Sequence, residues 1–241
     1  MKGVILAGGS GSRLYPLTKT TNKHLLPVYD KQMILYPIET LKKSGINDIL
    51  IISGPGHAGQ FLELLGSGYD LGLDIKYAIQ EKPLGIAHAI WVAARDFAKG
   101  DDMLIILGDN IFEDSFEKDI KSFKGGAKVF LKKVDNPHQF GIAEVKDGKI
   151  INIVEKPKEP KSDLAVVGAY IYDKHALEYA DKITLSERGE TEVTDLNNAY
   201  LKKGKLIFRE LEGFWLDAGT VDGLFKSSEF IRKVREHEKS C

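Results

Sequence analysis

Four short apolar runs in the first half of the chain constrain its fold more than any other feature. They are rich in β-branched residues and read as buried strands at residues 4–7, 49–53, 75–79 and 103–107. Stretches with helical periodicity lie between and after them, at 34–43, 60–65, 86–97 and 112–123. Strands and helices that alternate at this spacing predict right-handed βαβ units. We therefore expect an α/β fold with a doubly wound, mostly parallel, Rossmann-like sheet.

The second half of the chain predicts a less regular succession of elements. Strands are expected at 127–134, 141–145, 150–155, 165–172 and 206–211, and helices at 176–180, 195–202 and about 221–235. Asp147-Gly148 is a plausible hairpin turn, so additional antiparallel strands are expected here. No linker rich in Pro, Gly or Ser separates the two halves. We expect a single domain, 1–241, with halves at about 1–110 and about 111–241.

Charge and hydropathy narrow the class of partner. Lys and Arg number 34 against 35 Asp and Glu, so the basic excess typical of nucleic-acid-binding proteins is missing. The apolar runs fall far below the ~18 residues that span a bilayer, and the first is too short for a signal peptide. Cys241 is the single cysteine, which excludes an intramolecular disulfide. These features predict a cytoplasmic protein that binds small molecules and binds neither nucleic acid nor a membrane.

The first predicted strand runs directly into a glycine-rich loop, Gly8-Gly9-Ser10-Gly11. Glycines allow the main chain to approach a ligand, and successive N–H groups can hold phosphate oxygens, although a tight turn would also explain them. Leu14 stands at the third glycine position of the dinucleotide fingerprint, which disfavours a nicotinamide-dependent oxidoreductase. Arg13 and Lys23 add two cations that suit a triphosphate, with solvated surface cations as the alternative.

Asp109 and Asp217 each end an apolar segment. A carboxylate at the mouth of a buried strand costs desolvation free energy unless it has a partner, and Mg²⁺ is a natural one, although a helix or turn cap is the alternative. Ligands bind at the carboxyl ends of parallel strands, where the glycine loop, Gln80 and Gly108-Asp109-Asn110 are expected. Histidines without metal-ligand spacing are expected at the surface or in loops: His57, His88, His138 and His175.

Five motifs stand in order along the chain: Leu6-Ala7-Gly8-Gly9-x-Gly11-x-Arg13-Leu14, Asn22-Lys23-His24-Leu25-Leu26-Pro27-Val28, Leu107-Gly108-Asp109-Asn110, Glu155-Lys156-Pro157 and Trp215-Leu216-Asp217-Ala218-Gly219-Thr220. Together they span nearly the whole chain, and they resemble the motifs of the sugar-phosphate nucleotidyltransferases. Further segments are similar to the subgroup that acts on dTTP and glucose-1-phosphate: Pro27-Val28-Tyr29-Asp30-Lys31, Phe140-Gly141 and Arg188-Gly189-Glu190-x-Glu192-x-Thr194-Asp195.

The resemblance implies a division of labour between the halves. The nucleotide would lie in the first half, on Leu6, Gly8, Gly9, Gly11, Gln80 and Gly85, the last two at its base. The sugar would lie in the second half, on Asn110, Phe140, Gly141, Glu155, Val166 and Tyr170. Lys156 and Arg188 would hold the sugar phosphate, and Asp109 and Asp217 would bind Mg²⁺. Arg13, Lys23 and Lys156 would act on the reacting phosphates.

The implied reaction joins a sugar-1-phosphate to a nucleoside triphosphate and releases pyrophosphate. The attacking phosphate oxygen is already an anion, so the absence of a base–nucleophile pair in the sequence agrees with it. A uridylyltransferase is the alternative within the family. Retention of both aspartates, Asp109 and Asp217, and of Arg13 and Lys23 disfavours a non-catalytic relative. His24, His88 and Thr191 depart from the residues common in longer members. The chain is expected to be a short form of the family, with weak or absent feedback inhibition by downstream nucleotide sugars. Assembly into a homo-oligomer is possible.

Overall fold

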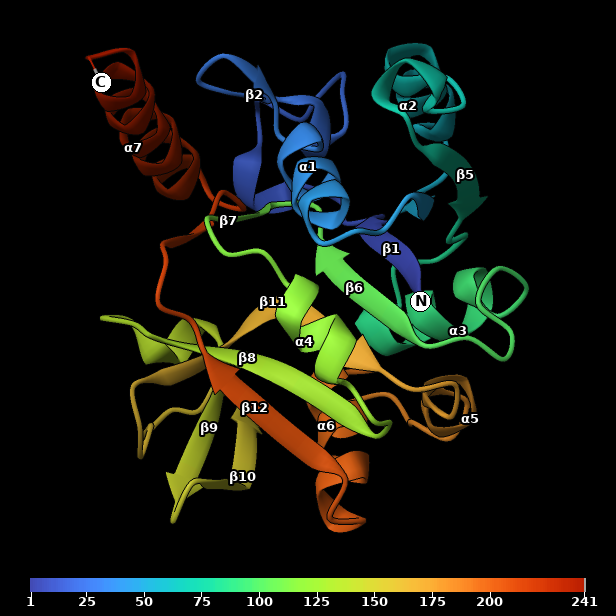
Figure 1. Cartoon of the computed structure of the whole chain (residues 1–241), viewed down its shortest axis with the longest axis vertical. Coiled ribbons are helices and arrows are strands. Elements are labelled where there is room, and N and C mark those ends of the chain that lie inside the picture. The colour runs from blue at the N-terminus through green and yellow to red at the C-terminus, as the bar shows by residue number, and fades with distance from the viewer. Residues whose placement is uncertain (241) are drawn as a thin grey trace.

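The computed structural model describes residues 1–240, and its centre is a mixed β-sheet with helices on both faces (Figure 1). Cys241 lies outside these described residues. The strands of the main sheet follow the order β10-β9-β11-β6-β1-β4-β5, and β8 joins β11 to β12. The first half of the chain supplies β1, β4, β5 and β6, and the second half supplies the remaining strands of this sheet.

The bounds of the elements are as follows. The strands are β1 (Lys2–Ala7), β2 (Pro27–Val28), β3 (Lys31–Gln32), β4 (Asp48–Ser53), β5 (Asp74–Ile79), β6 (Met103–Leu107), β7 (Asn110–Phe112), β8 (Ala127–Lys133), β9 (Gly141–Lys146), β10 (Lys149–Glu155), β11 (Leu164–Tyr172), β12 (Leu206–Glu210) and β13 (Trp215–Asp217). The α-helices are α1 (Leu35–Lys43), α2 (Ala58–Leu65), α3 (Ile86–Ala94), α4 (Glu117–Ser122), α5 (Ala176–Ala180), α6 (Val193–Lys202) and α7 (Val221–Ser240). Short 3-10 helices lie at Ser12–Leu14, Lys23–Leu25, Tyr69–Leu71 and Pro137–Gln139.

The predicted fold class is confirmed by the strand directions. Strands β6, β1, β4 and β5 are parallel, with Ile5 beside Ile51 on one side and beside Ile106 on the other. Strand β11 runs antiparallel to β6, β8 and β9, and β9 runs antiparallel to β10. Asp147 and Gly148 connect β9 to β10 with φ values of 49° and 70°, the positive pair that a tight type I′ hairpin requires.

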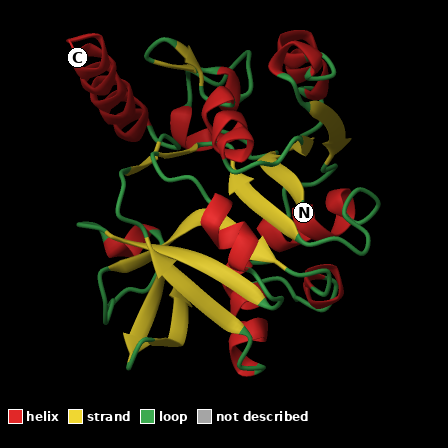
Figure 2. Ribbon diagram, viewed as in Figure 1, coloured by secondary structure: helices red, strands yellow, loops and turns green. Residues whose placement is uncertain are grey.

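Both faces of the sheet are covered by helices, which explains why its parallel strands read as unbroken apolar runs (Figure 2). In β1, Val4 and Leu6 face a core completed by α3, α5 and α6. Ile5 and Ala7 alternate with them and face a second core completed by α1, α2 and α4. Each core contains residues from both halves of the chain.

The prediction of a helix at 112–123 is wrong at its start. Asn110–Phe112 forms β7, which pairs antiparallel with β13 so that Phe112 lies beside Trp215, and helix α4 begins only at Glu117. The partner strand is about a hundred residues away in the sequence, so local periodicity carries no signal for it. The short strands β2 and β3 were also not predicted. The ends of α3 and α7 differ by a few residues from the expected ones, as helix ends commonly do.

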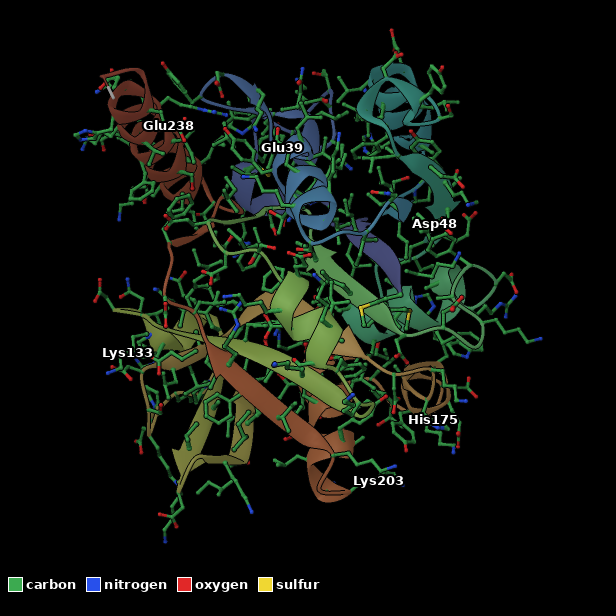
Figure 3. The ribbon with its side chains drawn as sticks, in the orientation of Figure 1. Glu39, Asp48, Lys133, His175, Lys203 and Glu238 are labelled. Atoms are coloured by element: carbon green, nitrogen blue, oxygen red, sulfur yellow. The ribbon has the colours of Figure 1, made fainter. Side chains whose placement is uncertain are left out.

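The two edges of the parallel strands carry different chemistry. At their amino ends Asp48, labelled in Figure 3, forms ion pairs with Lys2 and Lys76. At their carboxyl ends lie the glycine loop, Gln80 and Asp109. Within residues 1–240, no helix combines the length and the apolarity needed to cross a bilayer.

Candidate active site

A cleft opens at the carboxyl ends of β1, β5 and β6. One part is a cavity of about 430 Å³, whose lining includes the predicted residues Leu6, Gly8, Gly9, Gly11, Arg13, Lys23, Gln80, Gly85, Asp109, Lys156 and Arg188. An adjoining cavity of about 180 Å³ is lined by Arg13, Asp109, Asn110, Phe140, Gly141, Glu155, Lys156, Val166, Tyr170 and Asp217. Arg13, Asp109 and Lys156 line both, so they stand at the junction. The fold thus brings every predicted site residue to this one cleft.

The glycines of the loop are required by close approach. A Cβ on Gly8 would lie 3.0 Å from Gln80 Oε1, and one on Gly9 would lie 3.5 Å from Lys23 Nζ. Gly11 has φ 67°, in the left-handed region, and a Cβ there would meet Thr18 Cγ2 at 2.8 Å. Side chains at Gly8 and Gly11 would therefore crowd Gln80 and Thr18, and the Lys23 ammonium lies close to Gly9.

Lys23 is held over the loop by its two neighbours. Asn22 donates from Nδ2 to Ala7 O (3.1 Å), and its Oδ1 accepts from the main-chain N–H of His24. The His24 ring contacts the same oxygen through Nδ1 at 2.7 Å and packs against Gly108, where a Cβ would lie 2.6 Å from its Cδ2. Burial, with help from the Lys23 charge, lowers the pKa of His24 to about 3, so the ring is neutral at pH 7.

Asp109 and Asp217 converge on one point. A Cβ on Gly219 would lie 2.7 Å from Asp109 Oδ2, 2.9 Å from Asp217 Oδ1 and 2.9 Å from Arg13 Nη2. Asp109 also accepts from Lys23 Nζ at 2.5 Å, and its side chain is 8% exposed. The two aspartates lie close together because Asp109 follows the end of β6, and the pairing of β13 with β7 places Asp217 beside Asn110.

The pKa values of the two carboxyl groups are shifted in opposite directions. Burial alone would raise the pKa of Asp109, but the Lys23 ammonium and a hydrogen bond from Asn110 hold it well below its usual range. Burial, and then the negative charge of Asp109, raise the pKa of Asp217. Two hard carboxylate oxygens that repel each other at the edge of an open cleft fit a divalent cation, which would relieve the repulsion. Across residues 1–240, no cluster of three or more His, Cys, Asp and Glu residues has metal-binding geometry, so substrate or water oxygens would complete the coordination.

Asn110 is the centre of a hydrogen-bond network that sequence reasoning identified only in part. Its Oδ1 accepts from Trp215 Nε1 (2.7 Å) and from Gly168 N (3.1 Å), and its Nδ2 donates to Asp109 Oδ1 (3.0 Å). A Cβ on Gly168 would lie 2.5 Å from Asn110 Oδ1. Trp215 belongs to a quoted motif and could have been assigned, whereas Gly168 has no sequence signal beyond lying in a strand.

The second half of the chain forms the wall of the smaller cavity. The ring of Phe140 packs edge-on against Trp215 at 5.2 Å between centroids. Glu155 Oε2 accepts from Thr194 Oγ1 (2.6 Å), and Gly141 leaves room for both side chains, since a Cβ there would lie 3.0 Å from Thr194 Oγ1. Thr194 is a further lining residue, and it stands in a motif that was quoted without assigning it a role.

Lys156 and Arg188 reach the junction from loops. Lys156 has φ 42°, a conformation that costs free energy in a non-glycine residue and that clusters at functional sites. Its N–H donates to Phe140 O at 3.0 Å, which fixes this turn after β10. Arg188 lies 3.5 Å from Glu155 and from Glu192, and 3.6 Å from Glu190. Its charge is therefore shared among carboxylates rather than free in the cleft.

The prediction that His88 is a surface or loop residue is wrong. It lies in the first turn of α3, is half-buried, and its Nδ1 is 3.0 Å from Gln80 Nε2. Its position follows from β5 and α3, which bring the two residues together across the loop that contains Gly85. A larger hollow of about 820 Å³ lies between β10, α5 and α6, and its lining includes none of the predicted site residues.

Comparisons with known proteins identify the family of the chain. The fold and the cleft define an α/β protein of the nucleotide-binding type. A family model described as nucleotidyl transferase matches residues 2–234. The chain belongs to the nucleotidyl transferase family.

Similar proteins cover nearly the whole chain. A glucose-1-phosphate thymidylyltransferase of Neisseria meningitidis is 46% identical over 98% of this chain and 84% of its own length. One of Mycolicibacterium smegmatis is 43% identical over 97% of this chain and 83% of its own. A crystal structure from Bacillus anthracis, provisionally assigned the same name and solved with sucrose, is 49% identical with a TM-score of 0.92, covering 96% of this chain and 95% of that one.

Proposed function

We propose that this chain is a glucose-1-phosphate thymidylyltransferase, which transfers the dTMP group of dTTP to glucose-1-phosphate and releases pyrophosphate. The observation that carries the proposal is the junction of the two cavities, where Asp109 and Asp217 face Arg13 at the position of Gly219. The names of the relatives at 43–46% identity support the choice of substrates.

The larger cavity suits the nucleoside triphosphate. Its volume of about 430 Å³ lies within the range of small-molecule sites. The glycine loop lines this cavity and its main-chain N–H groups can donate to phosphate oxygens, while Lys23 and Arg13 supply positive charge near Asp109. Gln80 and Gly85 line the same cavity, where the base would be.

The smaller cavity suits the sugar. Carboxylate and amide groups from Glu155 and Asn110 offer hydrogen-bond partners to hydroxyls, while Val166, Tyr170 and Phe140 provide apolar walls. Lys156 stands at the boundary between the cavities and would hold the sugar phosphate beside the triphosphate. Arg188 would exchange one of its carboxylate contacts for the same phosphate.

The reaction needs positioning and charge stabilisation more than proton transfer. A phosphate oxygen of glucose-1-phosphate attacks the α-phosphorus, the new P–O bond forms, and the bond to pyrophosphate breaks with its electron pair on the leaving group. No base is required, since the nucleophile is an anion. Arg13, Lys23 and Lys156 bring two anions together and neutralise the charge that develops. Asp109 and Asp217 would hold Mg²⁺, which supplies further positive charge at the phosphates.

A pyrophosphate-release assay tests the function. dTTP, UTP, CTP, GTP and ATP are each combined with glucose-1-phosphate in the presence of Mg²⁺. We expect dTTP to react fastest, with dTDP-glucose identified by mass spectrometry. UTP as the fastest nucleotide would instead favour the uridylyltransferase, and release with none of the five would contradict the proposal.

A further inference from the structure

The amide nitrogen of Gln80 has both of its hydrogens engaged. Nε2 donates to the main-chain oxygen of Gly85 at 3.1 Å and lies 3.0 Å from Nδ1 of His88. An amide nitrogen carries two hydrogens, so the pair of contacts uses its full donor capacity. Gln80 is only 6% exposed, which leaves little space for another arrangement.

The amide oxygen of Gln80 is left for a ligand. Oε1 lies beside the glycine loop, 3.0 Å from the position of a Cβ on Gly8, and both residues line the larger cavity. Over residues 1–240, no protein donor is hydrogen-bonded to this oxygen. The cavity wall therefore presents a hydrogen-bond acceptor, and no donor, from this side chain.

We propose that His88 is a positioning residue for base selection: it holds Gln80 with Oε1 toward the base, so that the site takes the N3–H edge of thymine or uracil and rejects cytosine. The proposal rests on the proposed function, because it assumes that the base lies against Gln80. Thymine and uracil carry a hydrogen on N3, whereas cytosine carries a lone pair there, which would face the lone pairs of Oε1.

Two acceptors disfavour the reverse orientation of the Gln80 amide. Rotation by half a turn would place Oε1 against the carbonyl oxygen of Gly85 and against the lone pair of His88 Nδ1, both acceptors. Because the carbonyl oxygen of Gly85 can only accept, it fixes Nε2 on this side, so the His88 ring must accept at Nδ1 and carry its hydrogen on Nε2. Burial lowers the pKa of His88, which favours this neutral form. Without His88, Gly85 alone would oppose the rotation.

The His88 main chain is anchored from the second half of the chain. Thr191 Oγ1 accepts from His88 N at 2.8 Å, and Thr191 O accepts from Ala87 N at 3.2 Å, so Thr191 caps the first turn of α3. Thr191 also donates from its N–H to Leu84 O at 2.7 Å. The helix turn that carries His88 and the loop that carries Gly85 are thus fixed to one residue, which makes the two acceptors around Nε2 a rigid pair.

The test compares His88→Leu, which removes the acceptor at similar volume, with His88→Gln, whose amide oxygen restores one. The kcat/KM values for dTTP and CTP are measured with glucose-1-phosphate, and the Kd of each nucleotide is measured by calorimetry. We expect the ratio of kcat/KM for dTTP to kcat/KM for CTP to be about 10-fold lower in His88→Leu than in the unmodified enzyme, because one hydrogen bond that orients Gln80 is lost. The change is expected in KM rather than in kcat. His88→Gln is expected to keep the preference within about 3-fold.

Equal losses for dTTP and CTP in His88→Leu would mean that the ring only packs, and would overturn the proposal, as would an unchanged ratio. Thermal unfolding checks that each variant is folded, and His88→Ala must shift the ratio in the same direction if His88→Leu does not fold. Absence of turnover with dTTP in the unmodified enzyme would contradict the proposed function instead, while the ratio of the two Kd values would still test His88.

Discussion

Gly219 provides a direct test of the carboxylate pair, because its missing side chain leaves room for Asp109, Asp217 and Arg13 at once. In Gly219→Ala, the new Cβ would lie 2.7–2.9 Å from an atom of each. Ordinary contact requires these atoms to move away by at least about 0.5 Å. The backbone at Gly219 is outside the left-handed region, so alanine adds a steric effect without a conformational one.

The expected effect is large on turnover and small on stability. A displacement of this size among groups that position two anions is expected to lower kcat about 100-fold, or about 2.7 kcal/mol of activation free energy. Crowding by one methyl group costs about 1–3 kcal/mol of folding free energy, so Tm should fall by less than about 12 °C.

Gly59→Ala is the matched control. Gly59 lies in α2, and a Cβ there would meet no atom within 4 Å. Pyrophosphate release by both variants is measured under saturating substrates, with Mn²⁺ binding followed by electron paramagnetic resonance. We expect normal turnover for Gly59→Ala, and both low turnover and weaker Mn²⁺ binding for Gly219→Ala. Equal turnover in the two variants would refute the assignment of the pair to the metal and the reacting phosphates.

The remaining predictions concern the carboxylates, the base and a buried histidine. Asp109→Asn and Asp217→Asn should each lower kcat at least about 100-fold, with the fold intact by circular dichroism. A chelator should have the same effect on the unmodified enzyme. Near-normal turnover in both variants would mean that the two aspartates only cap a helix or turn. UTP should turn over more weakly than dTTP but above ATP and GTP, since one methyl group discriminates by only about 1–3 kcal/mol, and a purine reacting fastest would contradict this. The pKa of His24 in the folded protein, about 3, lies below its usual 6.5. The contribution of His24 to the free energy of unfolding is therefore fully present above pH 6.5 and is lost as the pH falls toward 3. The Tm of the unmodified protein should therefore drop more steeply below pH 6.5 than the Tm of His24→Gln. Equal slopes of Tm against pH would disprove the link between His24 protonation and stability.

The parts of the fold that the sequence predicts well are those specified by local pattern. Strands β1, β4, β5 and β6 were found because burial on two faces demands unbroken apolar runs. Strand β7 was mistaken for the start of a helix because Asn110–Phe112 is set by pairing with β13, and no local periodicity encodes a partner so distant.

The candidate site follows the same division. The motifs contain many of the residues of both cavities, whereas Gln80, Gly85, Val166 and Tyr170 lie outside them and were implied only by the resemblance to the family. His88 was missed because its significance comes from Nδ1 lying near Gln80, a contact that depends on how α3 packs beside β5. Gly168 was missed because only the proximity of Asn110 makes its lack of a side chain necessary. Types and spacing cannot report contacts of this kind.

The pairing of β7 with β13 has a consequence for the chain during its synthesis. A nascent chain completed through Tyr172 contains β1, β4, β5, β6 and β11, and so the neighbouring strands of the sheet centre, together with the glycine loop and Asp109. It does not yet contain Asp217, which arrives 108 residues after Asp109. We expect such a ribosome-bound intermediate to fold much of its sheet and yet to hold only one carboxylate of the proposed metal-binding pair, Asp109, which is paired with Lys23. Nucleotide turnover would then begin only after the residues of β13 have been added and this strand pairs with β7.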